Sequence, residues 1–306
     1  MDRSNPFFGQ VELLLRALPA VAKQECFALK GGTAINLFVR DLPRLSVDID
    51  LVYLPKEERE TALPAIGKAL AAIKADIEHT IRGAKVQITN PQATDSQRLT
   101  LSADGSQVKI ELSPVLRGTV WPAEMRSVVE KVEDLFGFAE IPVVSIPDLY
   151  AGKICAALDR QHPRDLFDIK LLFENEGIDR DLFKTFLVYL ISHGRPIAEL
   201  LSPAHKKIDR LFETEFRDMS EIPVTLDELL ETREQLVAHV QASLTDDDRA
   251  FLLSVKGREP DWSLLDLEGV ADLPAVKWKL INLNKMTPER HEETFNRLKA
   301  VLDKTA

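Results

Sequence analysis

The stretch that decides the fold is Leu29–Leu54, "LKGGTAINLFVRDLPRLSVDIDLVYL". Two glycines, Gly31 and Gly32, stand between a short apolar strand pattern and a segment with helical spacing of its apolar residues. Glycine lets a backbone approach a ligand closely, and a helix N-terminus offers free N–H groups and the positive end of a dipole. The order strand, glycine turn, helix, strand therefore predicts an anion-binding turn at the two glycines.

The last part of this stretch, "SVDIDLVYL" over residues 46–54, alternates like a strand. Alternation places Asp48 and Asp50 on one face with Ser46, about 7 Å apart from the strand rise. Two such carboxylates suit hard divalent cations, Mg²⁺ with Mn²⁺ as the alternative. Two ions can stabilise the attacking and leaving oxygens of a phosphoryl displacement. A solvated strand edge is the alternative for such a pair taken alone.

A third carboxylate lies on the strand predicted over residues 106–115, "SQVKIELSPV", whose polar face carries Glu111. If this strand lies beside the first one, Glu111 reaches the same ions. The predicted metal ligands are therefore Asp48, Asp50 and Glu111. The phosphates of a nucleoside triphosphate would lie at the glycine turn, with their metal ions on the aspartates.

The patterns change character near residue 145. Before it, the predicted helices are 10–24 and 56–78, and the predicted strands are 27–30, 46–54, 78–89, 98–103 and 106–115, mostly antiparallel, with a tight turn at Asp104–Gly105. After it, only helices are predicted. One begins at Ser145 as its N-cap, another ends at Gly177 as its C-cap, and further helices cover residues 181–193, 226–243 and 288–303. The fold class is α/β (α+β), a mixed-sheet core of residues 1–145 followed by a helical lobe of residues 146–306, with a hinge at Pro142–Pro147.

Composition narrows the function classes. The chain has 306 residues and a formal net charge of −10, which argues against wholesale wrapping of nucleic acid. Much of the acid lies in Glu221–Asp248, so a local basic groove is compatible with the total. Cys26 and Cys155 are far apart, and the histidines show no zinc spacing. We find no signal peptide or membrane-length apolar run, and therefore expect a cytoplasmic protein without membrane partners.

Gly-Gly, fifteen residues and then Asp-apolar-Asp resembles the signature of polymerase-beta-type nucleotidyltransferases. The fuller string "LKGGTAINLFVRDLPRLSVDID" resembles the AbiEii/AbiGii toxin family, which includes the MenT group. The resemblance extends to "VKIEL", "LYAGKICAALDR" and "HPRDLFDIKLL", over about residues 25–175. It implies a nucleotidyltransferase core at 1–145 and a helical domain at 146–306 that completes the active site. Glu111 departs from the family, where aspartate is more frequent.

The later motifs contribute Lys153, Asp165 and Asp168 as candidate catalytic residues. Lys153 lies at the margin of an apolar helix stripe, where a lysine usually extends to water; the resemblance favours a phosphate contact instead. Asp165 and Asp168 share a helix face. Either they complement the helix dipole, or one of them orients Lys153 or deprotonates the acceptor hydroxyl, and the sequence leaves that choice open.

The predicted nucleotide site comprises Gly31, Gly32, Thr33, Arg44, Ser46 and Lys153. Arg44 and Arg164 are candidate phosphate or carboxylate partners through their planar guanidinium groups, with ordinary surface ion pairs as the alternative. Outside the acidic segment, basic clusters occur at His205, Lys206, Lys207 and Arg210 and at Lys277, Lys279 and Lys285. Trp278 within the second cluster either stacks on a base or belongs to the core.

The resemblance implies an NTP-dependent toxin of a toxin–antitoxin or phage-defence pair, with an antitoxin encoded nearby. It implies transfer of a nucleoside monophosphate to RNA, with the tRNA 3′ end as the expected acceptor and release of pyrophosphate. Transfer to a protein or small molecule is the alternative among enzymes. A non-catalytic NTP sensor is the alternative outside them, and the intact Asp48, Asp50 and Glu111 argue against it.

Overall fold

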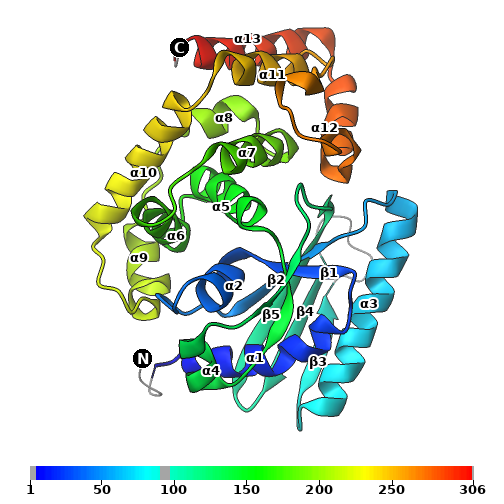
Figure 1. Ribbon diagram of the computed structural model, residues 1–306, viewed down its shortest axis with the longest axis vertical. Coiled ribbons are helices and arrows are strands. Elements are labelled where there is room, and N and C mark those ends of the chain that lie inside the picture. The colour runs from blue at the N-terminus through cyan, green and yellow to red at the C-terminus, as the bar shows by residue number, and fades with distance from the viewer. Residues whose placement is uncertain (1–4, 90–96, 305–306) are drawn as a thin grey trace. The chain divides into compact units, whose positions relative to one another are not determined.

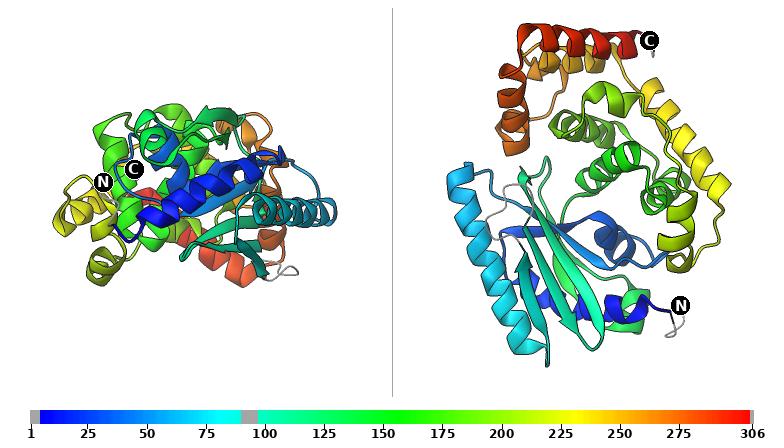
Figure 2. Two further views of the ribbon diagram at one scale, coloured as in Figure 1. Left: turned by 90° about the horizontal axis from the view of Figure 1, so that it is seen from below. Right: turned by 180° about the vertical axis from the view of Figure 1, so that it is seen from behind.

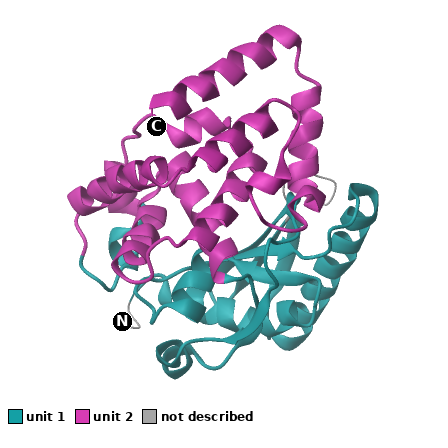
Figure 3. Cartoon of the chain, turned by 45° about the horizontal axis from the view of Figure 1, so that its top comes forward, with its two compact units in different colours: residues 1–145, 215–223 teal, residues 146–214, 224–306 magenta. Residues whose placement is uncertain are grey.

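The computed structural model describes residues 5–89 and 97–304, and the chain forms two compact units (Figure 3). The first unit comprises Met1–Ser145 and Glu215–Pro223, and the second comprises Ile146–Thr214 and Val224–Ala306. A short segment late in the chain therefore belongs with the first unit. The roles expected for the two parts, a nucleotidyltransferase core and a domain that completes the active site, stay predictions.

The first unit combines a sheet with helices (Figure 1). Its elements are α1 (Phe8–Ala22), β1 (Phe27–Lys30), α2 (Gly31–Ala34), the π-helical segment Ile35–Val39, β2 (Asp48–Tyr53), α3 (Arg59–Thr80), β3 (Lys85–Thr89), β4 (Gln97–Ala103), β5 (Ser106–Arg117), β6 (Glu124–Ser127), α4 (Glu130–Phe136) and β7 (Glu140–Val143). The strand expected over 78–89 is partly wrong, because α3 continues to Thr80 and the strand begins only at Lys85.

The described residues form one seven-stranded sheet in the order β3-β4-β5-β2-β1-β7-β6. The pairs β2–β5 and β1–β7 are parallel, and the other neighbouring pairs are antiparallel. The predicted mixed α/β fold is thus confirmed. Asp104 and Gly105 join β4 to β5 with φ values of 51° and 77°, which is the backbone of a type I′ hairpin turn.

The two faces of the sheet differ in polarity. Apolar side chains of neighbouring strands form continuous buried rows, such as Leu99, Ile110 and Ile49, which are at most 1% exposed. Helices α1 and α3 pack on the sheet and on each other (Figures 1 and 2), and burial of this apolar surface is the main stabilising term of the unit. The residues that alternate with these rows, Asp50 among them, face the other side.

The return of Glu215–Pro223 to the first unit has a local cause. The loop that leads into β2 pairs with it as an isolated antiparallel bridge between Arg44 and Ser220. The Leu45 N–H donates to the Met219 carbonyl at 2.8 Å, and the Glu221 N–H donates to the Pro43 carbonyl at 2.9 Å. This pairing supports the loop immediately before the two strand aspartates.

The described part of the second unit is helical. Its elements are α5 (Ile146–Arg160), α6 (Pro163–Glu174), α7 (Arg180–Ser192), α8 (Ile197–Leu201), α9 (Asp209–Glu215), α10 (Leu226–Ala242), α11 (Asp246–Lys256), the 3₁₀ segments Trp262–Leu264 and Val270–Asp272, α12 (Pro274–Asn284) and α13 (Pro288–Lys304). The last residue of α9 and the 3₁₀ segment Arg217–Met219 that follows it belong to the first unit. Helix α5 packs on α6, α7 and α10. Its start directly after Ser145 agrees with the expected N-cap position.

Gly177 departs from expectation, because α6 ends at Glu174 with Asn175 as its C-cap. Gly177 lies beyond the cap with a φ of 70°, and its N–H donates to the Leu172 carbonyl at 2.8 Å. Among the residues described, no helix is both long enough and apolar enough to cross a membrane.

Candidate active site

The strand aspartates lie where the alternation places them. Asp48 and Asp50 are half-buried, while Ile49 and Leu51 between and after them are fully buried. In the sheet Asp50 stands opposite Lys30 of β1 on one side and opposite Glu111 of β5 on the other. The expected proximity of Glu111 to the aspartates therefore occurs in the backbone register.

Glu111 itself is engaged by a cation that the sequence reasoning missed. Its register partner on β4 is Arg98, and their side chains form an ion pair with an N–O distance of 2.5 Å. The row across the sheet thus reads Arg98, Glu111, Asp50, Lys30, with two acids between two bases. Its outer cations offset the repulsion between the two adjacent carboxylates.

Gly31 and Gly32 leave space for charged side chains of the first unit. Gly31 is the first residue of α2, so the glycines form the first turn of the helix and do not precede it as expected. Gly31 has a φ of 74°, and a Cβ there would lie 2.4 Å from Oδ2 of Asp50. A Cβ on Gly32 would lie 2.7 Å from an Nη2 of Arg44. The missing side chains therefore make room for a carboxylate and a guanidinium of the protein itself.

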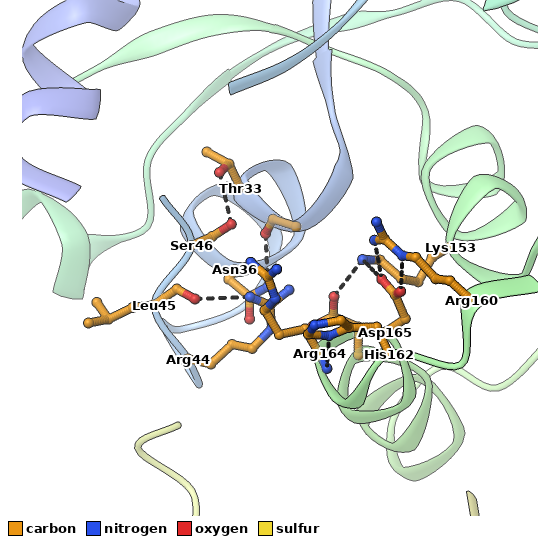
Figure 4. Close-up of polar contacts among 12 residues, drawn as sticks. Thr33, Asn36, Arg44, Leu45, Ser46, Lys153, Arg160, His162, Arg164 and Asp165 are labelled. Atoms are coloured by element: carbon orange, nitrogen blue, oxygen red, sulfur yellow. Dashed lines mark hydrogen bonds and ion pairs between the residues drawn. The ribbon is translucent and has the colours of Figure 1, made fainter. Parts of the chain in front are cut away.

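Thr33 and Ser46 join the helix to the strand (Figure 4). The Thr33 hydroxyl lies 3.0 Å from the Ser46 hydroxyl and donates to the Asp48 carbonyl at 2.5 Å. Both residues are buried, as is Arg44, whose Nη1 donates to the Leu45 carbonyl at 2.9 Å. A surface ion pair for Arg44, one of the two expected roles, is wrong. Contacts of these residues with a nucleotide stay predictions.

The donor set of β2 fits a hard cation. Asp48 and Asp50 are half-exposed carboxylates on the polar face, and carboxylate oxygens are the ligands that Mg²⁺ and Mn²⁺ prefer. Within the described ranges, however, no three His, Cys, Asp or Glu side chains converge as a ready-made metal site. Glu111 is turned to Arg98 instead. The two aspartates are therefore the better-supported ligands, and Glu111 would have to leave Arg98 to join them.

In the second unit, Lys153, Arg160, Asp165 and Asp168 form what we call the α5–α6 ion cluster. Figure 4 shows Lys153, Arg160 and Asp165 of this cluster. The Lys153 Nζ lies 2.9 Å from a carboxylate oxygen of Asp165 and 2.9 Å from one of Asp168. The side chains of the two aspartates are 0% exposed and that of Lys153 is 5% exposed. The expectation that Lys153 extends to water is wrong, because these two acids compensate its charge inside the unit.

Arg160 is the member of this cluster that the sequence reasoning missed. Its Nε and Nη2 donate to both oxygens of Asp165 at 2.5 and 2.8 Å, which is a bidentate pair. Burial by itself raises the pKa of Asp165. The charges and hydrogen bonds of Lys153 and Arg160 outweigh this effect and hold that pKa well below its usual range. Asp165 is thus a fixed anion that two cations share.

The remaining predicted contacts are distributed over the second unit. Arg164 is half-buried, and its backbone N–H donates to Nδ1 of His162 at 3.1 Å. Lys279 is committed to protein acceptors, since its Nζ donates to the carbonyls of His193 and Arg195 at 2.6 and 3.3 Å. Trp278 is 45% exposed, so a core position for it is wrong.

Comparisons with known proteins agree with this architecture. The family described as "Nucleotidyl transferase AbiEii toxin, Type IV TA system" matches residues 12–282. A search of curated proteins found no match. The chain is similar in structure to MenT4, a nucleotidyltransferase toxin from Mycobacterium tuberculosis H37Rv, with a TM-score of 0.62, 14% sequence identity, and coverage of 92% of this chain and 95% of that one. The family match spans most of the chain, and the predicted family is thereby confirmed: the protein belongs to the AbiEii family of nucleotidyltransferase toxins of type IV toxin–antitoxin systems.

Proposed function

We propose that this AbiEii-family enzyme transfers a nucleoside monophosphate from an NTP to the 3′-terminal hydroxyl of RNA, with tRNA as the acceptor, in a reaction that requires Mg²⁺ or Mn²⁺. The observation that carries the metal-dependent part is the Asp48–Asp50 pair, half-exposed on β2, with Asp50 packed against the Gly31 turn. The tRNA acceptor rests on the resemblance of the four sequence motifs to this family.

Asp48 and Asp50 would hold the divalent ion, which when bound neutralises charge that develops on the phosphate oxygens. The packing of Asp50 against Gly31 explains why a cation is needed there. A triphosphate at the first turn of α2 would otherwise meet the carboxylate that already lies beside that turn. A carboxylate and a phosphate at the same turn repel each other unless a positive charge lies between them.

In the transfer step the acceptor oxygen attacks the α-phosphorus, the bond from that phosphorus to its bridging oxygen breaks, and pyrophosphate leaves with the bonding electrons. The proton of the hydroxyl must pass to a base. We assign Asp165 to the positioning of Lys153, because Lys153 and Arg160 already fix both of its oxygens. Asp168 is then the proposed proton acceptor, and Lys153 the proposed phosphate contact.

An antitoxin partner follows from membership of a type IV system. We propose that the toxin acts in the cytoplasm, where NTPs and RNA are both available, and that the pair serves in phage defence. An upstream gene for a winged-helix regulator next to this one would support the pairing.

The acceptor is tested with labelled NTPs, MgCl₂ and purified tRNA that carries either a free or a blocked 3′ end. We expect the wild-type enzyme to label the tRNA with a free 3′ end and not the blocked tRNA. A chelator should abolish this labelling. The Asp48→Asn variant is the control for contaminating polymerases. Equal labelling of both tRNA forms contradicts the 3′ hydroxyl, and label in protein without label in RNA moves the function to protein nucleotidylation.

A further inference from the structure

Four basic residues of the second unit gather outside the sites described above, and we call them the cationic patch. They are Lys256 at the end of α11, Arg258 in the turn that follows, Lys279 on α12 and Arg290 on α13. The three helices are drawn in orange to red in Figure 1. The His291 ring lies 2.7 Å from the Lys256 carbonyl, so α13 is held to the end of α11.

In the part of the chain that the structure describes, none of the four residues of the cationic patch forms an ion pair. Lys256 is only 9% exposed, yet within residues 5–89 and 97–304 its Nζ makes no hydrogen bond or ion pair. The apolar stem of Lys256 is covered while its ammonium reaches solvent, which leaves the charge available to a bound anion. The negative end of the α11 dipole compensates Lys256 in part, since Lys256 lies in the last turn of that helix.

The neighbours of Lys256 add positive charge. Burial, together with the charges of Arg258 and Arg290, lowers the pKa of Lys256. Burial, together with the charge of Lys256, lowers the pKa of Lys279 to about 8. Lys279 is anchored on the carbonyls of His193 and Arg195, so it cannot move away from Lys256 without losing those bonds.

Arg258 completes the arrangement. It adopts a φ of 72°, in the left-handed region that non-glycine residues rarely occupy. Its Nη2 donates to the Met286 carbonyl at 3.0 Å, while its buried Nε has no hydrogen-bond partner. A left-handed residue directly after the C-cap is common where helices end, so the feature of Arg258 that bears on ligand binding is its unused buried donor.

We propose that the cationic patch is a binding site for a phosphate group, separate from the strand aspartates. A phosphate carries up to two charges and several acceptor oxygens, which suits a lysine and two planar arginine donors better than a single carboxylate does. The phosphate is either a free ion or a backbone phosphate of a bound RNA. We assign to this site the binding of an anion, because its four side chains are all basic.

The test compares the full chain with Lys256→Met, which keeps the apolar stem and removes the charge, and with Lys299→Met as a matched control on α13. Lys299 is exposed and outside the patch. Melting temperature is measured with rising sodium phosphate and with sodium chloride at equal ionic strength. We expect phosphate to raise the melting temperature of the wild type and of Lys299→Met more than chloride does. In Lys256→Met, phosphate should have no more effect than chloride. In phosphate-free buffer Lys256→Met should melt at the same or a higher temperature.

A short single-stranded RNA distinguishes the two sources of phosphate. If the site takes RNA, Lys256→Met weakens RNA binding and lowers the slope of log affinity against log salt by about 0.7. Phosphate stabilisation without any effect on RNA assigns the site to the free ion. The proposal is overturned if neither ligand stabilises the wild type, or if Lys256→Met keeps the full phosphate effect. Because the readout is binding, failure of nucleotide transfer would not affect it.

Discussion

In the first unit Asp48 and Asp50 are half-exposed carboxylates on β2, whereas in the second unit Asp165 and Asp168 are wholly buried around Lys153. In the α5–α6 ion cluster, the two acids form ion pairs with Lys153 and Arg160. The half-exposed pair on β2 is accessible to a bound cation, whereas the buried pair already holds a lysine. Mutation should therefore lower activity at β2 and stability at the α5–α6 ion cluster.

The largest effect is expected at β2, and it should fall on activity. Asp48→Asn or Asp50→Asn should lower nucleotide transfer by roughly a thousandfold or more, since removal of a metal ligand costs several kcal/mol in the transition state. The fold should be retained, because the carboxylates face away from the core. Initial rates with Mg²⁺ and circular dichroism measure the two properties.

Asp134→Asn is the matched control, because Asp134 is an exposed aspartate on α4 of the same unit. It should leave both the rate and the spectrum unchanged. Near-native turnover of Asp48→Asn would refute the assignment of metal ligands to β2.

The next effect belongs to the α5–α6 ion cluster and should fall on stability. Asp165→Asn leaves the buried Lys153 ammonium with less negative charge, which costs about 3–5 kcal/mol of unfolding free energy. Denaturant titration measures the loss, with the exposed Asp303→Asn as the control. Activity must be expressed per folded molecule, because a lower rate alone would not separate catalysis from unfolding.

The pH dependence of that loss follows from the direction of the pKa shift. The pKa of Asp165 is lower in the folded chain than in the unfolded one, so its contribution is complete above the ordinary aspartate pKa of about 3.9. It disappears as the pH falls further toward the folded value. The stability gap between wild type and Asp165→Asn should therefore be constant from pH 5 to 7 and narrow in acid. A gap that widens in acid would contradict the proposed ion pair.

A smaller effect on stability is expected at the glycine turn. Gly31→Ala adds a Cβ at 2.4 Å from the Asp50 carboxylate and forces a residue with a side chain to a φ of 74°. Together these changes should cost roughly 1–3 kcal/mol of unfolding free energy and displace Asp50. Gly67→Ala is the control, because Gly67 lies in α3 with nothing within 4 Å of the new Cβ. It should be neutral or stabilise the chain by up to about 1 kcal/mol.

Local sequence rules explain much of the first unit. The Asp104–Gly105 turn fixes the β4–β5 hairpin, and counting outward from it places Arg98 opposite Glu111. The ion pair that the sequence reasoning missed was therefore available from the turn. The neighbour on the other side, Asp50, comes from parallel pairing of β2 with β5, which are separated by α3, β3 and β4. No local pattern determines that register, so proximity of Glu111 to the aspartates could only be stated as a condition.

The α5–α6 ion cluster could not be predicted from the sequence, for a different reason. Periodicity identifies the face of a helix on which Lys153 lies, but not the helix that packs against it. The contact depends on the link between α5 and α6, where Gln161 is buried with a φ of 53° and donates to the Ala204 carbonyl at 2.8 Å. This left-handed residue turns the chain so that Arg160 and Lys153 both reach Asp165. A glutamine in that conformation has no signal in the sequence.

The smallest effect is expected at Glu111, the predicted third ligand. Its ion pair with Arg98 joins side chains that are 36% and 43% exposed, so Glu111→Gln should change the unfolding free energy by about 0–1 kcal/mol. If Glu111 leaves Arg98 to reach the ions of Asp48 and Asp50, the same variant should also lower transfer, by roughly 10–100-fold. That loss should shrink as the Mg²⁺ concentration is raised, because weakened ion binding is restored by mass action.

Arg98→Met supplies the matched comparison, since it removes the same ion pair from the other side. If Glu111 serves the metal, Arg98→Met frees its carboxylate and should leave transfer unchanged or raise it. Equal losses in the two variants, both insensitive to Mg²⁺, would instead show that the ion pair supports the sheet and that Glu111 is not a ligand. The balance of charge in the first unit would then resemble that of the second, with acids satisfied by the protein, and only Asp48 and Asp50 would remain to bind a metal.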